Sequence, residues 1–131
     1  MGLEIVTKAL EIAWDNITRS RREEDARFRE ALTKLSEAVT ETRIILGKQR
    51  KQEIASEDKE RLSRLWSKAG IAISEFDRDL AERCDIKGVF WAGPENWTDK
   101  QIDDANIRIV AMEREMRELF GGKRQIKKRE K

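Results

Sequence analysis

The chain has 131 residues and a formal net charge of +2; 38% of its residues are hydrophobic and 41% are charged. Its length suits a single domain, and its one proline, its lack of tyrosine and its many good helix formers argue against an all-β fold. Histidine is absent and Cys84 is the only cysteine, which excludes an internal disulfide and argues against di-iron sites and zinc sites built from several Cys or His.

The first predicted helix covers residues 3–19. Its apolar residues recur at intervals of three and four, which is typical of one amphipathic stripe. Between Ile17 and Phe28 only Ala26 is apolar, and two interpretations compete. Ser20 to Glu23 matches a capping box, which favours a turn near Ser20, whereas the absence of Gly and Pro allows one long helix. We favour the turn. The amphipathic stripe of the first predicted helix consists of Leu3, Val6, Leu10, Ala13, Trp14 and Ile17.

Three further helices are bounded by capping signals. The second begins at the capping box near Ser20, its apolar stripe resumes at Phe28, and it ends at Gly47. The third begins at Ser56, which is followed by two acidic residues that suit a first turn, and ends at Gly88. The last begins at a second capping box, Thr98 to Gln101, and ends at Gly121-Gly122.

Four amphipathic helices with short connections predict an all-α, antiparallel four-helix bundle over residues 1–122. A three-helix fold with a long first helix is the alternative. Residues 123–131 hold six basic residues and one acid, and we expect a flexible basic tail. The chain has neither a signal-peptide pattern nor a long apolar run, so we expect a cytoplasmic protein.

No motif for catalysis stands out. Cys84 ends an apolar stripe and no histidine could activate it, so we interpret it as a core residue. We therefore predict no enzyme activity, no cofactor and no small-molecule substrate. The leading hypothesis is a non-enzymatic helical-bundle module for protein–protein interaction or assembly.

Two apolar features are candidates for partner binding or self-association. Residues 88–97 read as an aromatic loop, in which Phe90, Trp91 and Trp97 could contact a partner or instead fold back and plug the end of the bundle. In the last helix, Ile107 and Val110 lie off the main stripe, which indicates either a central helix or a patch that pairs with another subunit.

Basic residues suggest two alternative functions. A helical nucleic-acid-binding subunit would contact RNA or DNA phosphates through a cluster near the end of the second helix together with the tail. A bundle that binds anionic membrane surfaces would use the tail alone. The candidate residues are Arg43, Lys48, Arg50, Lys51, Lys123, Arg124, Lys127, Lys128 and Arg129.

Overall fold

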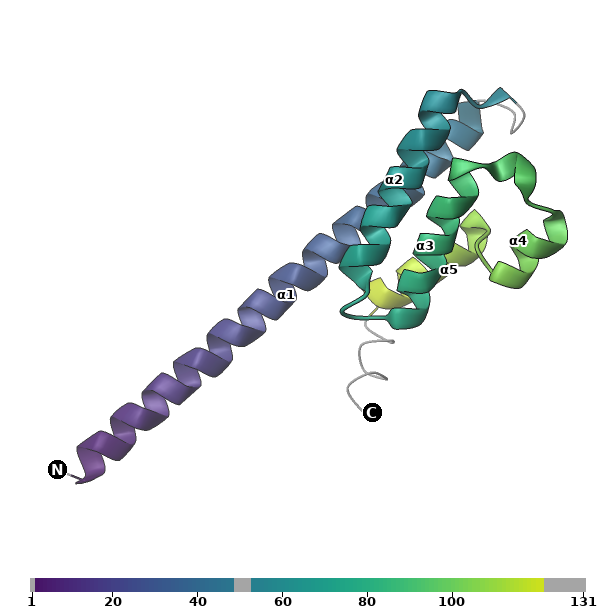
Figure 1. The fold of residues 1–131 in the computed structure, drawn as a ribbon. Helices are drawn as coiled ribbons and strands as arrows, with labels where there is room; N and C mark the ends of the chain where they lie inside the picture. Colours follow the sequence, from purple (N-terminus) through teal and green to yellow (C-terminus); the bar gives the residue numbers. More distant parts are fainter. Residues whose placement is uncertain (1, 49–52, 122–131) are drawn as a thin grey trace.

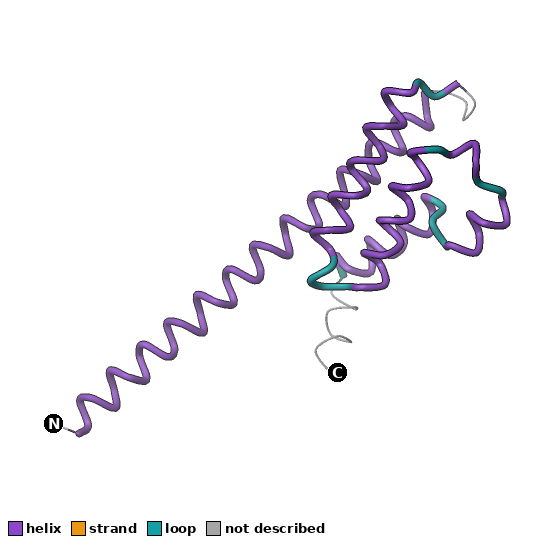
Figure 2. Tube along the Cα trace, in the orientation of Figure 1, coloured by secondary structure: helices purple, strands orange, loops and turns teal. Residues whose placement is uncertain are grey.

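The fold is all-α, as predicted (Figures 1 and 2). The computed structural model describes residues 2–48 and 53–121, and no strand occurs in these ranges. Helices α1, α2 and α3 follow one another in an antiparallel arrangement, and α5 packs against α1. The elements are α1 (Gly2–Lys48), α2 (Ser56–Ile73), α3 (Arg78–Ala92), the 3-10 turn η2 (Pro94–Asn96), α4 (Asp99–Ala105) and α5 (Ile109–Phe120).

The first helix departs from the four-helix prediction. The turn expected near Ser20 is wrong, because α1 continues through this position as one helix. No Gly or Pro interrupts residues 3–46, and opposite charges four residues apart in the sequence, such as Arg21 and Asp25, suit a stretch of helix that is exposed on all sides. The long first helix of the alternative prediction is therefore correct.

Only the second half of α1 packs against other helices. With 47 residues α1 is about 70 Å long, whereas the 18 residues of α2 span about 27 Å. Packing begins where the Nε of Arg27 lies 3.1 Å from the carboxylate of Glu75, and where the rings of Phe28 and Phe76 meet edge to face at 5.1 Å between centroids. Residues 2–26 project beyond the other helices (Figure 1). We call this segment the arm.

The core lies between the second half of α1 and helices α2, α3 and α5. Helix α2 contacts both α1 and α3. Large side chains from each of these elements are almost completely removed from solvent, and this burial is the main favourable contribution to folding. The largest of them are Leu35, Leu62, Trp66, Ile73, Leu80, Trp91, Ile107, Met112 and Leu119.

The predicted third helix is divided in two. Its start at Ser56 is confirmed, but α2 ends at Ile73, and α3 begins after Asp77, whose Oδ1 accepts a hydrogen bond of 3.0 Å from the backbone N–H of Leu80. The expected end at Gly88 is wrong, because α3 continues through it. A Cβ at Gly88 would lie 3.0 Å from the backbone oxygen of Ser63, so this glycine allows α2 and α3 to approach closely.

The predicted last helix is also divided. Its capping box is confirmed, since the Thr98 hydroxyl accepts from the Gln101 N–H and the Gln101 side chain accepts from the Thr98 N–H. The helix then stops at Asn106, which has a left-handed φ of 57°. A new helix begins at Ile109 and ends at Phe120, followed by Gly121 as expected. The break allows Ile107 to point into the core.

Candidate interaction surface

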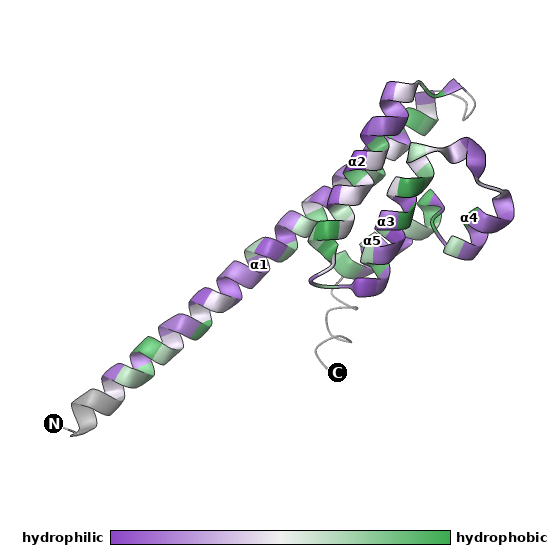
Figure 3. Ribbon diagram, in the orientation of Figure 1, coloured by the Kyte–Doolittle hydropathy of each residue, from purple (hydrophilic) through white to green (hydrophobic). Residues whose placement is uncertain are grey.

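The arm carries a row of exposed apolar side chains. Leu10, Trp14 and Ile17 are 65%, 68% and 48% exposed. Residues at this spacing lie on one face of a helix, and an apolar face of this kind normally packs against the core. Figure 3 shows hydrophobic positions along the projecting part of α1. The side chain of Ile12 is also exposed but lies on the opposite face, because it is two residues from Leu10. The arm therefore presents one apolar stripe that nothing in the described chain covers.

The apolar periodicity of residues 3–17 predicts this stripe, but the expectation that it packs in the bundle core is wrong for Leu10, Trp14 and Ile17. The relevant signal was the absence of any helix breaker before Gly47. A 47-residue helix is much longer than any helix that the remaining chain provides, so part of its apolar stripe has to remain without a partner.

The aromatic segment is part of the core rather than a loop on the surface. Phe90 and Trp91 belong to the last turns of α3 and are only 3% and 2% exposed. The ring of Phe90 meets those of Trp91 and Trp97 edge to face, with centroids 5.0 Å and 5.9 Å apart, and Trp97 is half-buried. This geometry corresponds to the plug interpretation, and it leaves Phe90 and Trp91 inaccessible to a partner.

The extra apolar face of the last helix is also mostly accounted for within the chain. Ile107 precedes α5 and is fully buried, so the prediction that it belongs to an exposed patch is wrong. Val110 remains 58% exposed, and a partner at this position stays a prediction.

The basic candidates do not form a cluster within the described residues. Arg43 pairs with Glu113 of α5, with Nη2 and Oε2 2.7 Å apart. Lys48 is exposed at the end of α1. Arg50, Lys51 and all the tail candidates from Lys123 to Arg129 lie outside the described residues. Binding to nucleic acid or to an anionic membrane therefore stays a prediction.

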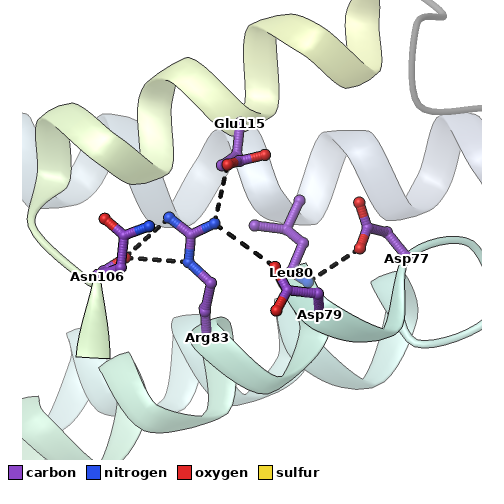
Figure 4. Close-up of polar contacts among 6 residues, drawn as sticks. All are labelled: Asp77, Asp79, Leu80, Arg83, Asn106 and Glu115. Carbon is purple, nitrogen blue, oxygen red and sulfur yellow. Dashed lines mark hydrogen bonds and ion pairs between the residues drawn. The ribbon is translucent and has the colours of Figure 1, made fainter. Parts of the chain in front are cut away.

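Arg83 forms the most extensive buried polar network (Figure 4). Its guanidinium donates two hydrogen bonds, of 3.0 Å and 2.8 Å, to the backbone oxygen of Asn106. Nη1 lies 2.9 Å from Glu115 of α5 and 3.8 Å from Asp79. Arg83 is 7% exposed and thereby joins α3 to the left-handed turn and to α5. These contacts hold the corner between α4 and α5 in place, so we interpret the role of Arg83 as structural.

Neither a metal-ligand cluster nor a readily ionised thiol occurs among the described residues. No group of three or more His, Cys, Asp or Glu among them could hold a metal ion. Burial raises the pKa of the Cys84 thiol to about 12, so the thiolate that nucleophilic catalysis requires is strongly disfavoured at neutral pH. None of the described helices has the length and apolar character needed to cross a membrane.

Comparisons with known protein families, with curated proteins and with solved structures find no match for this chain. The function has to be inferred from the surfaces of the molecule itself. Among these surfaces, the exposed stripe of the arm is the feature that folding of the chain does not explain.

Proposed function

We propose that this chain is a non-enzymatic interaction or assembly module that binds protein through its arm. The observation that carries the proposal is the exposure of Leu10, Trp14 and Ile17 on one face of a helix that projects from the bundle. The bundle holds the base of this helix, and the arm presents the binding surface.

The energetics of the arm favour a partner. Fully burying one large aliphatic side chain contributes about 1.5–3 kcal/mol, so the stripe has several kcal/mol to gain from association. Tryptophan is enriched at binding hot spots because a rigid ring buries a large area. An isolated helix is only marginally stable in water, and a helix in a protein gains most of its stability from packing of its apolar face. Binding would therefore both cover the stripe and stabilise the helix of the arm.

Photo-crosslinking followed by a binding measurement tests the proposal. A photoreactive amino acid in place of Trp14 should give a discrete adduct in the full-length chain, whereas the same group in place of the equally exposed Ile71, on α2, should not. The crosslinked protein is then identified and purified, and its affinity for the full-length chain is measured by calorimetry.

The decisive comparison uses two variants of the same helix. The double variant L10D/I17D places charges on the stripe and should weaken binding at least about tenfold, because a charge in an apolar interface is costly. The control I12D makes a similar change on the opposite face and should bind like the unaltered chain. Equal affinities for L10D/I17D and the unaltered chain would show that the arm is not the binding surface.

A further inference from the structure

We infer that the arm binds the arm of a second copy of this chain, in antiparallel orientation. This inference rests on the proposed function and specifies its partner. It follows from three properties of the arm: its exposed area, the spacing of its apolar residues and the distribution of its charge.

The chain exposes more surface than a compact monomer of its mass. The accessible surface of the chain is 9457 Å², whereas a compact monomer of 15.3 kDa is expected to expose about 7100 Å². The projecting arm accounts for part of this excess. A specific interface needs about 800 Å² from each partner, and pairing of two projecting arms would require no rearrangement of the bundle.

The spacing of the apolar residues is that of a two-helix seam. Leu10 and Ile17 are seven residues apart, and Ala13 and Trp14 lie between them, which is the heptad pattern of a coiled coil. If Leu10 of one copy faces Ala13 of the other, the two-fold axis repeats this contact, and Leu10 of each copy is opposite the small side chain of Ala13.

The charge of the arm favours the antiparallel orientation. Residues 2–15 contain three acids and one lysine, while residues 19–22 contain three arginines and no acid. An antiparallel pair places the three arginines of one copy towards the net-negative N-terminal part of the other. A parallel pair would instead place the three arginines of one copy beside those of the other.

The polar side of the arm also argues against a lipid occupant. An amphipathic helix that binds an anionic membrane carries mainly lysine and arginine around its apolar face. Over its full length, residues 2–26, the arm contains six acids and four bases, so its net charge is negative. A second copy of the arm therefore fits this surface better than an anionic bilayer.

Sedimentation of the full-length chain tests the inference. The mass should rise from 15.3 kDa towards twice that value between micromolar and millimolar protein. L10D/I17D should remain monomeric over this range, and the control I12D should dimerise like the unaltered chain. Circular dichroism and melting of the bundle verify that all three are folded. A chain that stays monomeric, or an L10D/I17D variant that dimerises normally, would overturn the inference.

Disulfide trapping tests the orientation. In a Cys84→Ala background, chains carrying L10C and chains carrying A13C are mixed in a glutathione buffer. The antiparallel register predicts that the mixed 10–13 disulfide exceeds either homodimer. A predominance of the 10–10 and 13–13 disulfides would indicate a parallel pair and overturn the orientation.

Two outcomes separate this inference from the proposed function. If the chain stays monomeric while L10D/I17D no longer binds the protein identified by crosslinking, the inference that the partner is a second copy is wrong and the proposed function stands. If the monomer instead co-sediments with phosphatidylserine vesicles and L10D/I17D does not, a membrane occupies the stripe and both proposals fail.

Discussion

The indole nitrogen of Trp66 on α2 donates a hydrogen bond of 2.9 Å to the hydroxyl of Thr42 on α1. The Thr42 hydroxyl in turn donates a bond of 2.7 Å to the backbone oxygen of Ala38, and both side chains are fully buried. A single threonine thus satisfies the polar atom of the largest residue in the core and joins the first two helices. The pair fixes the register at which α2 packs against α1.

Removal of this hydroxyl should destabilise the protein. The variant Thr42→Val preserves the shape of the side chain but leaves the indole N–H of Trp66 without an acceptor, at a cost of about 1–3 kcal/mol. Urea denaturation measures the free energy of unfolding. The control is Thr33→Val, whose hydroxyl makes the same kind of bond, 2.8 Å to the oxygen of Arg29, on an exposed face. Equal losses in the two variants would contradict the role assigned to Thr42.

The guanidinium of Arg83 should contribute more to stability than any ion pair on the surface. In Arg83→Met, Glu115 loses the guanidinium that lies 2.9 Å from it, and the oxygen of Asn106 loses its two hydrogen bonds from Arg83. Breaking a buried pair by removing one partner costs about 3–5 kcal/mol. The exposed pair of Arg117 and Glu113 provides the control, because Arg117→Met should cost only about 0–1 kcal/mol.

Thermal unfolding of the two arginine variants provides the measurement. Proton exchange at the backbone amides of residues 106–112 should increase in Arg83→Met before the rest of the bundle is affected, since the guanidinium holds this corner. A small loss in Arg83→Met, comparable to that in Arg117→Met, would show that the corner is held by the packing of Ile107 instead.

Capping signals and apolar periodicity were sufficient to predict the helical class and several helix ends. The box from Thr98 to Gln101 forms as expected because its two hydrogen bonds are local and need no other part of the chain. The same pattern at Ser20 was misleading. Ser, Arg and Glu also occur in the interior of a helix when they are exposed to solvent. The sequence alone therefore does not show whether the chain turns at Ser20 or continues as a helix.

The remaining differences between the predicted and the observed helices depend on contacts between segments that are distant in the sequence. The break at Asn106 is stabilised by Arg83, which lies 23 residues earlier in the chain. The aromatic residues at 90 and 91 remain helical because they fit the core at the end of α3. The arm was missed for the opposite reason: an amphipathic stripe indicates that a face is to be covered, but not whether the covering surface belongs to the same molecule.

The thiol of Cys84 should react only after unfolding. Desolvation by burial, together with the carboxylate of Asp85, raises its pKa from 9.0 to about 12. In the folded state at pH 8, alkylation should therefore be slow and should accelerate in urea. A cysteine at the exposed position of Ala9, in a Cys84→Ala background, is the control and should react rapidly in both conditions. Rapid alkylation of folded Cys84 would contradict its buried placement.

The same shift in pKa has a defined effect on stability. Between pH 9 and pH 12 the folded state retains a proton on Cys84 that the unfolded state loses, so unfolding becomes more favourable as the pH rises. The free energy of unfolding of the unaltered chain relative to Cys84→Ala should be constant below pH 9 and should decrease above it. Denaturation curves at pH 7, 8, 9 and 10 measure this difference, and a difference that increases above pH 9 would contradict the sign.

Two glycines on helices should respond in opposite ways to substitution by alanine. At Gly88 the added Cβ would lie 3.0 Å from the backbone oxygen of Ser63, and this part of α2 can move away only if the helices separate. The Ser63 hydroxyl also donates a bond of 2.7 Å to the backbone oxygen of Gly88, which the separation would lengthen. At Gly47 nothing lies within 4 Å of the added Cβ.

Gly88→Ala should therefore lower the free energy of unfolding by about 1–3 kcal/mol, the usual cost of overpacking. Gly47→Ala should leave it unchanged or raise it by up to about 1 kcal/mol, because alanine loses less backbone entropy than glycine when a helix forms. The two variants add the same methyl group to a helix, so their difference in urea denaturation isolates the contact between α2 and α3. A stabilising Gly88→Ala would mean that the two helices do not approach as closely as the position of Ser63 requires.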